Sequence, residues 1–155
     1  MRRLLSITGQ AVATVLGAGF SPVAPGTAGS LVSAAVFWFT GPGSTAARFL
    51  LVPVVIIGYW GCTVGRREWG TDPSRVVADE FAGCWLACLA VPARWGIPGV
   101  AAAFALFRLF DILKPWPVSF FDRQDTPLGI LMDDLAAGLL AVLIIVAANA
   151  VHGLL

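Results

Sequence analysis

The chain has 155 residues and a net charge of +1, with 58% apolar residues, 12% charged residues and a mean hydropathy of +0.85. Its length fits one domain, residues 1–155, and its composition is more apolar than that of a soluble globule, so we expect an integral membrane protein. The balanced charge argues against nucleic acid as a partner, and three cysteines in apolar stretches, far from His152, indicate neither a disulfide framework nor a zinc site.

The N-terminal segment begins with a basic pair, Arg2 and Arg3, as a signal peptide does. The apolar stretch behind this pair is interrupted by four polar residues, which is poor for a signal-peptide core: Ser6, Thr8, Gln10 and Thr14. We therefore expect no cleavage and predict an amphipathic or re-entrant helix over residues 4–20.

Five apolar segments of helical length follow, separated by glycine and proline: residues 28–40, 46–65, 79–92, 97–113 and 134–152. They predict an all-α, multi-helical integral membrane protein with about five membrane-embedded helices after the N-terminal one. A full crossing needs about 20 residues. The short segments 28–40 and 79–92 are therefore candidates for partial insertion.

The loops between these segments differ in charge from one side of the membrane to the other. If Arg2 and Arg3 lie inside, five crossings leave only Arg48 and Arg94 of the ten basic residues toward the outer side, as the positive-inside rule requires. All nine carboxylates then fall on the inner side, although acids hardly count toward that rule. We expect this charged side to face the cytoplasm.

A turn rich in proline and small residues, Ser21–Ser30, leads into the first apolar segment. Hydroxyls and backbone N–H groups at a helix start can bind phosphate, which makes Thr27 and Ser30 candidate substrate ligands. A Ser or Thr N-cap after a proline turn is the commoner explanation of such a pattern, and the sequence leaves both readings open.

Two acidic tracts are almost copies of each other: Asp79-Glu80-Phe81-Ala82-Gly83 and Asp133-Asp134-Leu135-Ala136-Ala137. Each precedes an apolar run, and the positive end of a helix dipole favours anions, so helix-start chemistry explains one acid per helix. Two adjacent carboxylates at the edge of hydrocarbon are costly unless a cation offsets them. Both helices run from inside to outside, so the four acids can converge on one hard divalent ion such as Mg²⁺.

Three charged residues lie three positions apart in an otherwise apolar segment: Arg108, Asp111 and Lys114. This spacing places them along one helix face. A structural ion pair between Arg108 and Asp111, with Lys114 reaching the interface, accounts for them. The functional reading assigns Arg108 and Lys114 to an anionic substrate and Asp111 to the metal cluster or to the orientation of its ligands.

Several routes to phosphate-ester hydrolysis lack the residues they need. Cys88 and Arg94 have the spacing of a cysteine phosphatase, but the loop between them has no glycine, and Pro92 removes an N–H that a phosphate loop requires. His152 is the only histidine and lies outside any basic motif, and no Asp-x-Asp nucleophile motif occurs. Metal-assisted attack by water remains.

Four ordered blocks within about residues 16–140 resemble the phosphatidylglycerophosphatase A family of bacterial membrane lipid phosphatases: Gly19–Leu31, Asp72–Gly83, Phe107–Arg123 and Gly129–Gly138. The resemblance implies a single membrane-embedded lipid phosphatase domain in the bacterial cytoplasmic (inner) membrane. It also implies Mg²⁺-dependent hydrolysis of the terminal phosphomonoester of phosphatidylglycerophosphate, which gives phosphatidylglycerol and phosphate at the cytoplasmic face.

The residues and the resemblance together predict the site. Asp79, Glu80, Asp133 and Asp134 hold Mg²⁺, and one carboxylate, with Asp79 and Asp134 as the leading candidates, serves as general base. Asp111 is a third catalytic candidate. The predicted substrate ligands neutralise the phosphate, and they are Thr27, Ser30, Arg108, Lys114 and Arg123, the last of them in the third block.

Two other classes of function stay open at this stage. A small membrane transporter usually has its site near the midplane between inverted repeats, whereas these acid-headed helices run in the same direction. A non-catalytic lipid-binding protein differs from the enzyme in releasing no phosphate. The sequence carries no signal for an oligomeric state.

Overall fold

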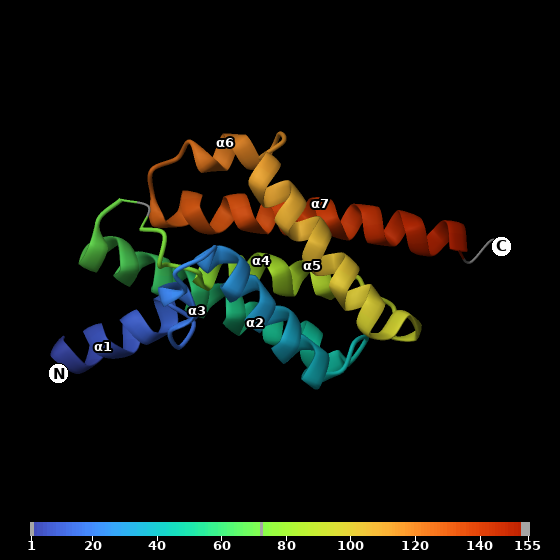
Figure 1. The fold of residues 1–155 in the computed structure, drawn as a ribbon, viewed down its shortest axis with the longest axis horizontal. Coiled ribbons are helices and arrows are strands. Elements are labelled where there is room, and N and C mark those ends of the chain that lie inside the picture. The colour runs from blue at the N-terminus through green and yellow to red at the C-terminus, as the bar shows by residue number, and fades with distance from the viewer. Residues whose placement is uncertain (1, 72, 153–155) are drawn as a thin grey trace.

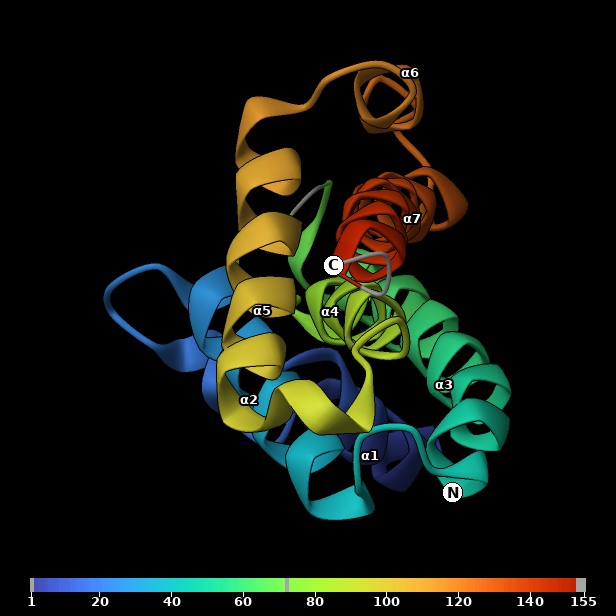
Figure 2. The same ribbon diagram turned by 90° about the vertical axis from the view of Figure 1, so that its right-hand side faces the viewer.

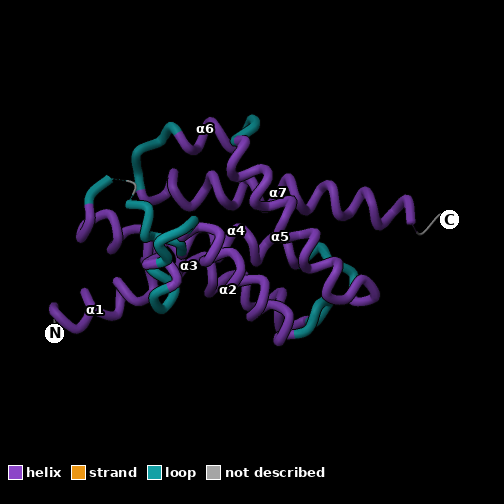
Figure 3. Tube along the Cα trace, in the orientation of Figure 1, coloured by secondary structure: helices purple, strands orange, loops and turns teal. Residues whose placement is uncertain are grey.

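A computed structural model of the protein describes residues 2–71 and 73–152, and within them it contains helices and no strands. The predicted all-α class is therefore confirmed (Figures 1 and 3). The α-helices are α1 (Arg2–Ala13), α2 (Pro25–Thr40), α3 (Thr45–Trp69), α4 (Ala78–Cys88), α5 (Gly96–Leu113), α6 (Val118–Asp122) and α7 (Pro127–His152). Two short 3₁₀ helices are η1 (Ala18–Phe20) and η2 (Ala93–Trp95).

We expected about five membrane-embedded helices plus an N-terminal one, and fewer helices than this can cross the membrane. In the described part of the chain, three segments are long and apolar enough to cross a membrane: Thr45–Trp69, Ala93–Leu113 and Pro127–Val151. The 16 residues of α2 and the 11 residues of α4 rise only about 24 Å and about 16 Å, against a hydrocarbon layer of about 30 Å. Both segments are helical as predicted, but they are too short to cross the membrane.

The helix predicted over residues 4–20 ends earlier than expected, at Ala13. The first helix stops at Ala13 because Val15, Leu16 and Gly17 have positive φ values of 47°, 55° and 105°, which a right-handed helix does not accept. The predicted segment 4–20 is therefore a helix, a tight turn and the 3₁₀ helix η1.

Helix α4 lies in the middle of the bundle, enclosed by α2, α3, α5 and α7 (Figure 2). Its Cys84, Trp85 and Cys88 are fully buried, and the Trp85 indole N–H donates a hydrogen bond to the Ala47 carbonyl at 3.1 Å. The Trp85 ring also packs edge-on against Phe37. Protein neighbours thus bury most of α4 and hold its acidic start in place.

Helices α4 and α7 run in the same direction and touch through their backbones (Figure 1). A Cβ placed on Gly83 would lie 2.6 Å from the Asp134 carbonyl oxygen, and one placed on Gly138 would lie 2.4 Å from the Gly83 carbonyl oxygen. Only glycine allows this approach. Asp79 precedes Gly83 by one helical turn, as Asp134 precedes Gly138, so the contact brings the two acidic tracts together.

We expect Gly138→Ala to lower the free energy of unfolding by about 1–3 kcal/mol, because the new methyl group must push the two helices apart. Denaturation in detergent micelles, followed by circular dichroism, measures the change. Ala147→Val, which enlarges an exposed side chain on the same helix, is the control and should stay within about 0.5 kcal/mol of the wild type. Equal effects of the two substitutions would contradict the close helix contact.

Candidate active site

A polar cavity of about 520 Å³ lies where the starts of α2, α4 and α7 meet the end of α5. Its wall contains carboxylates from four helices and from the loop before α7: Asp79, Glu80, Asp111, Asp122, Asp125, Asp133 and Asp134. Arg108 and Lys114 also line it. The two acidic tracts, distant in sequence, therefore face one space.

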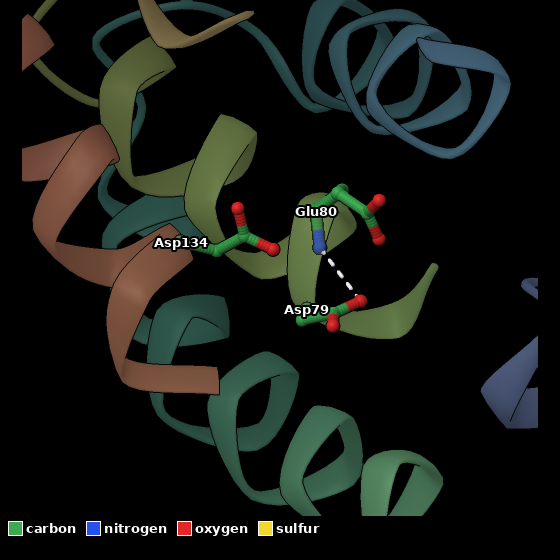
Figure 4. A group of neighbouring side chains, drawn as sticks. All are labelled: Asp79, Glu80 and Asp134. Atoms are coloured by element: carbon green, nitrogen blue, oxygen red, sulfur yellow. Dashed lines mark hydrogen bonds between the residues drawn. The ribbon is translucent and has the colours of Figure 1, made fainter. Parts of the chain in front are cut away.

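Three of these carboxylates form a tight group (Figure 4). Asp79, Glu80 and Asp134 each offer an oxygen, and these oxygens lie within 4.8 Å of one another. Glu80 Oε2 and Asp134 Oδ1 are buried and have no hydrogen-bond partner among the described residues. A buried carboxylate oxygen without a donor needs a proton or a cation. The three oxygens have the chemistry that a hard divalent ion selects, so this group fits a metal site.

The surroundings of the first acidic pair disfavour its charged form. Burial raises the pKa of Asp79, although hydrogen bonds with Glu80 act to lower it. Burial, followed by the charge of Asp79 and a hydrogen bond with it, raises the pKa of Glu80 well above its usual value, and Arg108 offsets only part of that rise. A bound cation would reverse this penalty, because it favours the ionised carboxylates.

Asp133, the fourth predicted ligand, lies outside the tight group. Its Oδ2 accepts a hydrogen bond from Lys114 Nζ at 2.9 Å, and Lys114 also pairs with Asp122. Burial acts to lower the pKa of Lys114, but the hydrogen bonds that it donates to these two carboxylates raise the pKa above its ordinary value. Lys114 is therefore a fixed positive charge at the wall of the cavity, and the metal role of Asp133 stays a prediction.

Arg108 and Asp111 form an ion pair at 2.6 Å, as their spacing predicted. Arg108 Nη1 also lies 3.5 Å from the Ser30 hydroxyl, which itself donates to the Gly26 carbonyl at 2.7 Å. The Arg108 Nε is buried and has no hydrogen-bond partner in the described part of the chain. Arg108 therefore places a positive charge at the wall of the cavity, beside Asp111.

The start of α2 reaches the cavity through residues that the sequence did not single out. Pro25 and Gly26 line it, and a Cβ on Gly26 would lie 2.2 Å from Glu80 Oε1. Of the predicted ligands in this turn, Ser30 contacts Arg108 and Thr27 is half-buried, but neither lines the cavity. Arg123 is exposed at the end of α6 and does not line it either.

Two further features of the site were missed. Arg66, in the last turn of α3, pairs with Asp125 and ties the loop before α7 to the bundle. The glycine contact between α4 and α7 was also missed, although Asp79 and Gly83 share their four-residue spacing with Asp134 and Gly138. That repeated spacing is the signal that could have identified it.

Comparisons with known proteins match nearly the whole chain. The family model described as phosphatidylglycerophosphatase A matches residues 11–149. Phosphatidylglycerophosphatase A of Escherichia coli K12 is 36% identical over 137 residues, which cover 84% of this chain and 77% of the relative. The protein of the same name from Haemophilus influenzae is 34% identical over 143 residues, which cover 88% and 85%.

A protein of Bacteroides thetaiotaomicron with the provisional name phosphatidylinositol-3-phosphatase is also similar. It is 43% identical over 152 residues, which cover 92% of this chain and 94% of the relative. No solved structure matches the chain significantly.

We expect a divalent cation such as Mg²⁺ to stabilise the EDTA-treated protein, because an ion that binds only the folded state shifts the unfolding equilibrium. At about 100 times the dissociation constant the gain is about 2.7 kcal/mol, or a rise in Tm of roughly 5–10 °C. Thermal unfolding in detergent measures it. Asp134→Asn should lose most of the rise, and Glu68→Gln, whose carboxylate pairs with Ser6 and Gln10 away from the cavity, should keep it. An undiminished rise in Asp134→Asn would remove Asp134 from the metal site.

Proposed function

The chain belongs to the phosphatidylglycerophosphatase A family of phosphoric monoester hydrolases, and on this premise we propose that it hydrolyses the terminal phosphomonoester of phosphatidylglycerophosphate. The products are phosphatidylglycerol and inorganic phosphate, in phospholipid biosynthesis. One observation carries the proposal: the cavity combines three converging carboxylates with the positive charges of Arg108 and Lys114. A metal-assisted attack on a phosphate ester needs both.

Asp79, Glu80 and Asp134 are the residues that would hold Mg²⁺. When bound, the ion polarises phosphoryl oxygens and lowers the pKa of a coordinated water. Asp133 lies beside this group and holds Lys114 at the wall of the cavity through their ion pair. The buried oxygens of Glu80 and Asp134 that have no hydrogen-bond partner in the described ranges support this assignment.

The protein's own residues supply the positioning and the proton transfer. Arg108 and Lys114 neutralise the phosphate and the charge that develops on it, since phosphoryl transfer relies on positioning and electrostatics. A carboxylate of the cluster, Asp79 or Asp134, takes the proton of the attacking water as the new phosphorus–oxygen bond forms. The bond to the glycerol oxygen breaks, and that oxygen takes a proton from solvent water as it leaves. The carboxylate then returns its own proton to solvent. Asp111 orients Arg108 through their ion pair.

The distribution of basic residues supports a cytoplasmic orientation in the bacterial inner membrane. Arg66 and Arg67 in the last turn of α3 and Lys114 after α5 lie at the cavity end of the spanning helices, whereas Arg48 and Arg94 lie at the opposite ends. The positive-inside rule places the richer end in the cytoplasm. The phosphorylated headgroup then enters from the cytoplasmic leaflet, and the acyl chains stay in the bilayer.

A second substrate has specific support, because the relative from Bacteroides thetaiotaomicron is named for phosphatidylinositol-3-phosphate hydrolysis. Both lipids carry a phosphomonoester on a polyol headgroup. Purified protein should be assayed for phosphate release from both lipids and from phosphatidic acid, with Mg²⁺ and with EDTA. We expect phosphatidylglycerophosphate to be the best substrate and EDTA to stop its turnover. A transporter or a non-catalytic lipid-binding protein would release no phosphate from any of them.

Asp79→Asn should lower kcat by about 100-fold to 10,000-fold, the range expected for loss of a general base or of a group that holds the catalytic ion. Phosphate release at saturating Mg²⁺ measures it. Glu68→Gln, whose carboxylate lies away from the cavity, should leave kcat within about twofold of the wild type. Full turnover by Asp79→Asn would exclude Asp79 from the site.

A further inference from the structure

An apolar groove of about 290 Å³ separates α2 from α5 on the outer surface of the bundle. Its walls are Leu31, Ala35 and Trp38 of α2 and Ile97, Ala101 and Phe104 of α5. Leu31 and Ile97 are more than half exposed, so the groove opens toward the surroundings of the protein. We propose that this groove binds one acyl chain of the lipid substrate. The inference rests on the proposed lipid phosphatase function.

The groove and the polar cavity lie along the same two helices, α2 and α5. On α5, Ile97, Ala101 and Phe104 are followed at helical spacing by Arg108, which lines the cavity. On α2, Leu31 directly follows Ser30, whose hydroxyl contacts Arg108. The apolar groove therefore ends near Arg108, the proposed phosphate ligand. A molecule that lies along the groove and reaches Arg108 needs an apolar tail and an anionic head.

The lining of the groove fits a hydrocarbon chain. A single extended hydrocarbon chain needs no hydrogen-bond donors or acceptors, and the side chains that line the groove offer none except the Trp38 indole.

A second apolar groove on the other side of α2 provides an internal comparison. It has a volume of about 330 Å³ and includes Val32 and Val36 of α2, together with residues of α1, α3 and α4. Arg108 does not come from any helix that lines it. A bulky substitution at Val36 therefore tests crowding of an apolar groove without touching the proposed chain site.

Ala101→Trp fills the proposed site about 10 Å along α5 from Arg108. With dioleoyl phosphatidylglycerophosphate in mixed micelles, KM should rise about tenfold while kcat stays within about twofold, as expected for the loss of a few buried methylene contacts. With glycerol 3-phosphate, a phosphomonoester without acyl chains, kcat/KM should stay within about twofold of the wild type. Val36→Trp should change neither substrate by more than about twofold.

Equal effects of Ala101→Trp on the dioleoyl lipid and on glycerol 3-phosphate, or no effect on the dioleoyl lipid, would overturn the proposal. Equal effects of Ala101→Trp and Val36→Trp would overturn it as well.

A readout without turnover separates this proposal from the proposed function. Phosphatidylglycerol with a diazirine at the end of one acyl chain is photolysed with the wild-type protein, and the adducts are mapped by mass spectrometry. We expect adducts concentrated on Trp38 and Ile97 and reduced by Ala101→Trp. Adducts spread evenly over both grooves would overturn the chain site. Absence of phosphate release with adducts in the α2–α5 groove would overturn only the proposed phosphatase function.

Discussion

The backbone contact between α4 and α7 at Gly83 and Gly138 is the constraint on which the site depends. It brings two parallel helices close enough for Asp79, Glu80 and Asp134 to place oxygens within 4.8 Å of one another. Such a group of buried carboxylates is unstable when all are ionised and nothing offsets them, because desolvation and mutual repulsion act in the same direction. The close packing of the helices therefore produces a cluster of carboxylates that a bound cation would stabilise.

The carboxylates around the cavity form two sets that differ in their partners. The outer carboxylates, Asp122, Asp125 and Asp133, form ion pairs with Lys114 or Arg66, and these pairs fix the loop before α7 against the bundle. Within the described part of the chain, the inner carboxylates Asp79, Glu80 and Asp134 form no ion pair with a basic residue. Glu80 and Asp134 each have a buried oxygen with no hydrogen-bond partner there. Arg108 and Lys114 line the same cavity. The cavity thus combines oxygen ligands for a cation with positive charges for an anion.

Much of this was readable from the sequence because helix periodicity and repeated motifs are local signals. The all-α class, the two acidic tracts and the Arg108–Asp111 pair follow from spacing alone. The number of membrane crossings does not follow from the sequence, because an apolar segment as short as α4 can be buried by protein rather than by lipid. The split between Asp133 and the three inner carboxylates also needed coordinates, since adjacent residues on a helix point about 100° apart.

We propose that the acidic tracts around Asp79 and Asp134 share one ion. Replacing that ion by Fe²⁺ in the presence of ascorbate and peroxide generates hydroxyl radicals at the metal, which cut the backbone nearby. Mapping the cuts by mass spectrometry should show cleavage close to both tracts, and excess Mg²⁺ should suppress both sets of cuts together. Cleavage at one tract alone, or cuts that Mg²⁺ does not suppress, would contradict a shared metal site.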